Sequence, residues 1–175
     1  IEKIASAVSL VKDNVVWDEK YKVFPEPVGQ VVKARSGSNA DINCLIAGCL
    51  REMGYTVDMV LVKMRSSGML LDFQPERNPY DTFILRVTGS DGSQYYLDGG
   101  SPHGYINVLP PDLLVTNARL VRPNVPGEWV DLTRLTRNGT TMTVATTLTD
   151  DLRLSGEYTC KETGNTSYST KESYS

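Results

Sequence analysis

The chain contains the three residue types from which serine hydrolases build a catalytic site. Ser38 lies in the turn "RSGSNAD" before an apolar run, His103 is the single histidine, and Asp98 precedes it by five residues. A serine nucleophile, an imidazole base and an orienting carboxylate together carry out acyl transfer. Ser38, His103 and Asp98 therefore form one candidate hydrolase site.

The same residues also have simpler structural roles. Ser38, Asn39 and Asp41 are types that cap or charge the first turn of a helix, and His103 lies in the irregular segment "SPHGY". An isolated serine and histidine seldom form a triad, and their spacing sets no geometry, so the capping role is favoured. Cys44 is a weaker nucleophile candidate, because it lies about one turn inside the predicted helix, away from the positive end of the dipole.

Two segments have the apolar spacing of helices. Residues 1–16 predict an amphipathic helix, and residues 40–53 predict a helix that is apolar on most sides and therefore central. Gly54 is expected to end the second helix. The intervening segment "KVFPEPVGQ" is predicted to be a loop, because its two prolines disfavour a regular element.

From residue 55 onward the apolar period changes to two, which predicts antiparallel strands. A long loop at 65–79, the turn "GSDGS" and the loop "SPHGYINVLPPDLL" separate some of them. The predicted strands are "YTVDMVLVKM", 81–88, 93–98, "ARLVRP", "WVDLT", "TMTVATTLT" and "LRLSGEYTCKE". The Ser/Thr-rich tail "TGNTSYSTKESYS" is expected to be weakly packed or to be a strand without a partner.

Helices followed by antiparallel strands predict an α+β fold. We expect a core over residues 1–135 and a β-strand extension over 136–175, which would be the start of a truncated C-terminal β domain or a small β element of its own. The first residues, "IEKIASAVSL", contain no signal peptide, as expected for a piece of a longer protein.

Composition argues against several classes of partner and ligand. The net charge of −3 and pI near 5.2 disfavour nucleic acid and anionic membranes as partners. No apolar run approaches the roughly 20 residues of a membrane span. The three cysteines include no Cys-x-x-Cys pair, so we expect neither a zinc site nor a disulfide scaffold, and no metal or cofactor.

The run "SGSNADINCLIAGCLREMGYTVDMVLVKMRSSG" resembles the helix-to-strand signature of bacterial transglutaminase-like domains, relatives of papain-like cysteine proteases. The positions that fall on the pattern are Gly37, Asp41, Asn43, Leu50, Arg51 and Gly54. The segment "SQYYLDGGSPHGYINVLP" is similar to the family's strand ending in Leu-Asp. The resemblance covers roughly residues 1–150 and implies an N-terminal helix, a buried core helix and an antiparallel sheet.

In that family a cysteine at the start of the core helix is activated by a histidine, which an Asp or Asn orients. The resemblance places Asn39 at the cysteine position, Thr82 at the histidine position and Asp98 at the carboxylate position. Asparagine is not a nucleophile, and threonine cannot act as a base near neutral pH. The resemblance therefore implies a degenerate active site.

Asp98 has two interpretations. It is either a relic of the triad or an acceptor for the backbone of the turn that follows, and without a histidine partner the turn role is favoured. Gly99 and Gly100 are predicted to provide a positive φ. Aromatic residues in the loops either line a binding cleft or pack those loops on the core: Tyr21, Phe24, Phe73, Tyr80, Tyr95, Tyr96, Tyr105 and Trp129.

We therefore expect a non-catalytic transglutaminase-like domain that binds or scaffolds a protein, peptide or glycan within a larger bacterial protein. Flanking domains of the same polypeptide are expected partners, and the family implies a periplasmic, cell-envelope or secreted location. The alternative is an active hydrolase or acyl-transferase of the same superfamily with a non-standard nucleophile such as Ser38.

Overall fold

An antiparallel sheet of five strands organises the middle of the chain. Its strand order is β5-β4-β3-β6-β7. The strands are β3 (Thr56–Val62), β4 (Thr82–Thr88), β5 (Gln94–Leu97), β6 (Ala118–Arg122) and β7 (Val125–Val130). The computed structural model describes residues 1–70 and 79–174. The loop predicted at 65–79 therefore falls partly, and Phe73 wholly, outside the described residues. Helices combined with an antiparallel sheet confirm the predicted α+β class.

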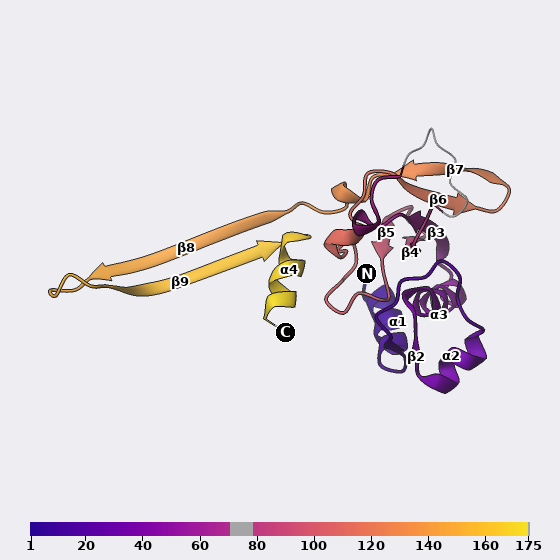
Figure 1. The fold of residues 1–175 in the computed structure, drawn as a ribbon, viewed down its shortest axis with the longest axis horizontal. Helices are drawn as coiled ribbons and strands as arrows, with labels where there is room; N and C mark the ends of the chain where they lie inside the picture. The colour runs from indigo at the N-terminus through magenta and orange to yellow at the C-terminus, as the bar shows by residue number, and fades with distance from the viewer. Residues whose placement is uncertain (71–78, 175) are drawn as a thin grey trace.

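Helices α1 (Glu2–Lys12) and α3 (Asn39–Glu52) lie on one side of this sheet (Figure 1). Alternate residues of β4 point toward them and join one core with residues of both helices: Phe83, Leu85, Val87, Ile4, Val11, Ile46 and Leu50. α1 is shorter than predicted, because Val16–Trp17 form β1, which pairs in parallel with β2 (Ser36–Gly37).

Loops cover the opposite face of the sheet. The other alternate residues of β3 and β4 pack there against the segments that follow β5 and β7, in a second core: Val60, Val62, Ile84, Leu109, Leu113, Leu120 and Leu132. Because both faces of the sheet are covered, β4 is buried along nearly its whole length. This burial explains why most residues of its sequence are apolar.

The start of α3 is capped as the sequence predicts. The backbone N–H of Asp41 donates to Ser38 Oγ at 3.4 Å, and the N–H of Ser38 donates to Asp41 Oδ2 at 2.7 Å, which confirms the capping box. At the other end Gly54 takes a φ of 86°, the left-handed conformation that terminates many helices.

Two predicted elements are wrong in detail. The segment "KVFPEPVGQ" runs into helix α2 (Val28–Ala34), which begins directly after Pro27, because a proline just before the first turn removes no intrahelical hydrogen bond. The strand predicted as "WVDLT" is β7, which starts earlier and contains Pro126. A proline is tolerated there because β7 is an edge strand.

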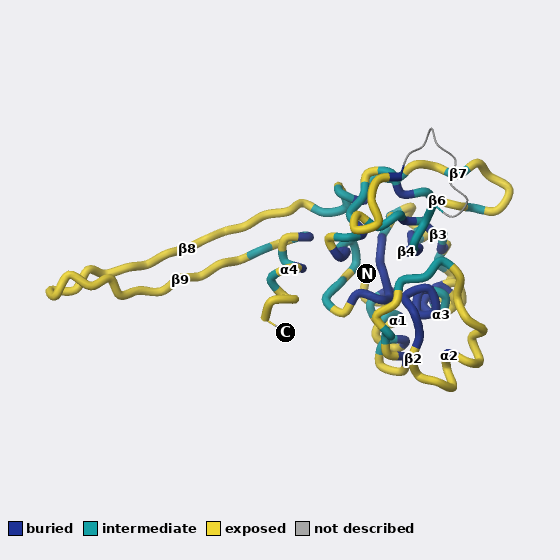
Figure 2. Tube along the Cα trace, viewed as in Figure 1, coloured by how far each residue is buried: buried dark blue, intermediate teal, exposed yellow. Residues whose placement is uncertain are grey.

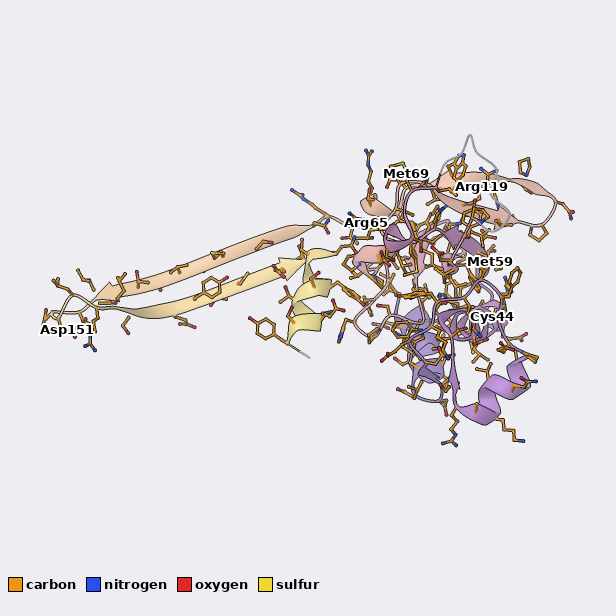
Figure 3. The ribbon with its side chains drawn as sticks, viewed as in Figure 1. Cys44, Met59, Arg65, Met69, Arg119 and Asp151 are labelled. Carbon is orange, nitrogen blue, oxygen red and sulfur yellow. The ribbon has the colours of Figure 1, made fainter. Side chains whose placement is uncertain are left out.

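The last part of the chain forms a long hairpin that projects away from the sheet (Figure 1). We call β8 (Gly139–Leu148), β9 (Leu154–Thr163) and the turn between them the arm. Among the described strands, β8 and β9 pair only with each other. Nearly all of the arm is exposed (Figure 2), and Asp151 lies at its far end (Figure 3).

The prediction that the tail is a strand without a partner is wrong. The tail forms helix α4 (Thr166–Ser173), which fastens the base of the arm to the body. Tyr168 is buried and its hydroxyl accepts a hydrogen bond from Ser101 Oγ at 3.3 Å, while Asn165 Oδ1 accepts from the N–H of Leu109 at 3.1 Å. The domain boundary at 135 stays a prediction.

Truncating the fully buried Ile46 to alanine should lower the free energy of unfolding by about 2–4 kcal/mol, because a cavity would open between α3 and the sheet. Urea denaturation followed by circular dichroism measures this. The matched control is Leu10→Ala on α1, where the side chain is 59% exposed and a loss below about 1 kcal/mol is expected. Equal losses in the two variants would contradict the packing described.

Candidate functional site

The ends of three elements meet at the first turn of α3. Asn39 is the first residue of that helix, Thr82 is the first of β4, and Asp98 directly follows β5. All three are buried. Asn39 Nδ2 donates to Thr82 Oγ1, to the carbonyl of Phe83 at 3.3 Å and to Asp98 Oδ1 at 3.4 Å. The structure thus brings together the three positions that the sequence analysis assigned to a degenerate triad.

A second amide, Asn43, completes this arrangement. Its Nδ2 donates to the Phe83 carbonyl and to Asp98 Oδ1, both at 2.9 Å, and its Oδ1 accepts from the N–H of Gly99 at 2.6 Å. Asn43 lies four residues after Asn39 and hence on the same face of α3. From the sequence, Asn43 was assigned only to the family's helix pattern, and its i, i+4 spacing from Asn39 was the signal that the two amides act together. We call Asn39, Asn43, Thr82 and Asp98 the amide cluster.

Asp98 is the titratable member of the amide cluster. Burial raises the pKa of its carboxyl, and the hydrogen bonds from Asn43 and Asn39, then the charge of Lys12, oppose that rise. The backbone of Gly100 also acts to lower this pKa, and the turn role of Asp98 stays a prediction. Asp98 Oδ2 has no hydrogen-bond partner within the described residues. The net effect of burial is to favour the protonated form.

The two glycines after Asp98 are needed for a different reason than the one predicted. Neither takes a positive φ. Instead, a Cβ on Gly99 would lie 2.5 Å from Ile42 Cγ2, and a Cβ on Gly100 would lie 2.6 Å from Asn39 Cβ. The missing side chains let this turn press against α3, which holds Asp98 within reach of the two amides.

The alternative serine–histidine site is not assembled. Ser38 is fully buried, and its hydroxyl donates to Asp41 Oδ2 at 2.7 Å within the capping box. The His103 ring instead packs edge-on against Tyr168 of α4, with the ring centroids 6.0 Å apart. Over residues 1–70 and 79–174, no hydrogen bond joins His103 to Ser38 or to Asn39.

Cys44, the weaker nucleophile candidate, is half-buried on α3 (Figure 3). Burial raises the pKa of its thiol, and the nearby Asp41 charge adds to that rise. A nucleophilic cysteine needs the opposite shift, toward the thiolate. Cys44 therefore has the environment of an inert thiol.

An open cavity of about 200 Å³ lies beside the amide cluster, lined by Lys12, Asp98, Leu97, Tyr105 and Ile106, among others. Lys12, at the end of α1, donates from Nζ to the carbonyl of Ser101. Burial lowers the pKa of this ammonium group, and the charge of Asp98 partly restores it. Lys12 is not recognisable as a site residue from the sequence, because its spacing is that of any polar residue closing an amphipathic helix.

The loop aromatics do not gather around this cavity. Tyr105 lines it, whereas Tyr96 belongs to the core and Phe24 is 81% exposed. Trp129 lies on the edge strand β7, where the guanidinium of Arg119 sits 4.6 Å from its ring centroid. Tyr96, Phe24 and Trp129 therefore do not line a common cleft with Tyr105.

The chain matches no known protein-family model, no curated protein and no solved structure. None of its described helices has the length and apolar character needed to cross a bilayer. Within the same described ranges, no group of three His, Cys, Asp or Glu side chains is placed to hold a metal ion. The geometry of the amide cluster is therefore the main guide to function.

The buried Asp98 should make stability depend on pH. Its folded pKa lies above the ordinary value of 3.8, so the folded state holds a proton that the unfolded chain releases. Asp98 therefore contributes stability that is complete below pH 3.8 and is lost as the pH rises through the folded pKa, by at most about 1.4 kcal/mol per pH unit.

Asp98→Asn should remove this contribution, as measured by urea denaturation at a series of pH values. Asp150→Asn, at the exposed turn of the arm, is the matched control and should keep the wild-type pH profile. An Asp98→Asn profile that parallels the wild type would show that this carboxyl ionises normally.

Proposed function

We propose that this chain is a transglutaminase-like domain without catalytic activity, which acts as a protein-binding or scaffolding module. The observation that carries the proposal is the amide cluster. At the positions where the resemblance implies a cysteine and a histidine, Asn39 donates a hydrogen bond to Thr82, and neither residue is a nucleophile or base near neutral pH. The three positions meet in space, and the residues at the first two lack the chemistry of acyl transfer.

The hydrogen bonds of Asn39 support a structural role. Its Oδ1 accepts a hydrogen bond from the backbone N–H of Lys22 at 3.0 Å, while its Nδ2 donates to Thr82, to the carbonyl of Phe83 and to Asp98. A cysteine in its place could satisfy few of these buried groups, each of which is costly to leave unpaired. Asn39 is thus suited to joining α3 to β4 and to the turn after β5.

The arm supports binding of a protein. Two open cavities border Lys12, of about 200 Å³ and 350 Å³, which lie below and near the lower end of the roughly 300–1,000 Å³ usual for ligand sites. The arm, by contrast, presents two exposed ten-residue strands with several large apolar side chains. Contiguous exposed apolar surface marks protein interaction sites. The arm is therefore the more suitable binding element, and a protein is the more suitable partner.

Active-site probes test the absence of catalysis. A fluorophosphonate should not label Ser38, because its hydroxyl is buried and bonded to Asp41. Iodoacetamide should alkylate the exposed Cys160 faster than the half-buried Cys44, so Cys160 serves as the internal reference. Peptide mass spectrometry measures both reactions. Stoichiometric labelling of Ser38 that Ser38→Ala abolishes, or preferential alkylation of Cys44, would refute the proposal.

A further inference from the structure

The arm has one apolar face and one polar face. Its strand register puts three apolar cross-strand pairs on the same side, Met142–Cys160, Val144–Tyr158 and Leu148–Leu154, with Thr146–Gly156 between them and Thr140–Glu162 at the base. The pairs on the other side are Gly139–Thr163, Thr141–Lys161, Thr143–Thr159, Ala145–Glu157 and Thr147–Ser155. Apolar and polar residues thus alternate along both strands, as in a hairpin with one side covered. Every large side chain of the apolar face is nevertheless more than half exposed.

An isolated hairpin of this kind needs a partner. Two strands alone are marginally stable in water, and a third strand or a covering layer is normally required. α4 covers only the base of the arm, where it forms one wall of a groove whose other wall includes Tyr158 and Cys160. From Val144 to the tip, the apolar face has no cover within the described residues (Figure 2).

The pattern of the apolar face is nearly symmetric about its centre. The central pair is Thr146–Gly156, which is small and flat. Two residues toward the base lie Val144 and Tyr158, and two residues toward the tip lie the paired leucines of β8 and β9. Met142 and Cys160 follow at the base, and Leu152, which is 81% exposed, follows in the turn.

A symmetric apolar pattern is what a two-fold interface requires, because each surface must complement itself. If a second arm packs face to face and antiparallel, its leucine pair lies over Val144 and Tyr158, and its Leu152 reaches the groove beside α4. The same orientation keeps the acidic turns of the two copies, each with Asp150 and Asp151, at opposite ends of the paired arms. A parallel orientation would instead put the two acidic turns together.

The area is sufficient for a stable dimer. Five side chains of the apolar face and Leu152 in the turn are 58–81% exposed: Met142, Val144, Leu148, Leu152, Leu154 and Tyr158. At typical side-chain areas they present roughly 700 Å² per copy, close to the ~800 Å² per partner of a standard interface.

We propose that the partner of the arm is a second copy of this chain, whose arm packs antiparallel on the apolar face with Thr146 and Gly156 at the two-fold axis. The proposal rests on the proposed function for the role of the arm as a binding surface, and adds the identity of the partner. The tip of each arm occupies the groove between β9 and α4 of the other copy.

Sedimentation velocity across micromolar concentrations tests the proposal. The wild-type chain should be a dimer, and Val144→Glu should weaken association by more than about tenfold, because it puts a charge in the interface. Thr143→Glu is the matched control, one residue away on the polar face, and should change association by less than about twofold. A second pair, Leu154→Lys and Ser155→Lys, repeats the comparison on β9.

Circular dichroism of each variant verifies that the sheet and helices remain folded. A wild-type chain that stays monomeric at all concentrations would overturn the proposal, as would equal effects of Val144→Glu and Thr143→Glu. Either result would leave the probe-labelling test of catalysis unaffected, so failure of this inference is distinct from failure of the proposed function.

Crosslinking tests the antiparallel orientation. In a Cys160→Ser background, Thr146→Cys should give a covalent dimer with a bismaleimide whose reach matches the ~10 Å spacing of stacked sheets, whereas Thr147→Cys should not. In the unmodified chain the two Cys160 residues should lie roughly 27 Å apart and remain uncrosslinked. Crosslinking through Cys160, with none through Thr146→Cys, would overturn this orientation.

Discussion

The arrangement of the body depends on one interaction, the capture of the buried Asp98 carboxyl by the side-chain amides of Asn39 and Asn43. A carboxyl removed from water must be neutralised or well hydrogen-bonded, and two donors on one face of α3 supply those bonds. The glycines after Asp98 allow the close approach, and the capping box fixes where α3 begins. Helix, sheet and turn are thereby joined at the first turn of α3.

The body and the arm differ in which side chains they bury. In the body, polar groups are enclosed and almost all are paired, and apolar groups fill two cores on either face of the sheet. In the arm, the backbone is paired across two strands but the apolar side chains remain in water. The exposed apolar surface of the arm is therefore the part of the molecule on which the proposed association depends.

Sequence periodicity predicted the elements whose environment repeats regularly. The central helix, its cap, the strands of the sheet and the hairpin around "DD" all followed from local patterns. So did the grouping of Asn39, Thr82 and Asp98, although only through a family resemblance. The features that the sequence did not predict depend on contacts between distant parts of the chain. The role of Asn43 depends on its hydrogen bonds with Phe83 and Gly99. The position of α4 depends on the hydrogen bond between Tyr168 and Ser101. The alternation in β8 correctly predicted a strand, but a pattern on one strand does not reveal what covers it.

The most direct measurement of the central claim is hydrogen exchange of the Asn39 and Asn43 side-chain amides, followed by nitrogen-15 NMR. If both amides bind Asp98 in a closed cluster, their Nδ2 protons should exchange far more slowly than those of the exposed Asn14 side chain. Exchange at the rate of Asn14 would show that water reaches the cluster freely, and would contradict a structural role for these residues.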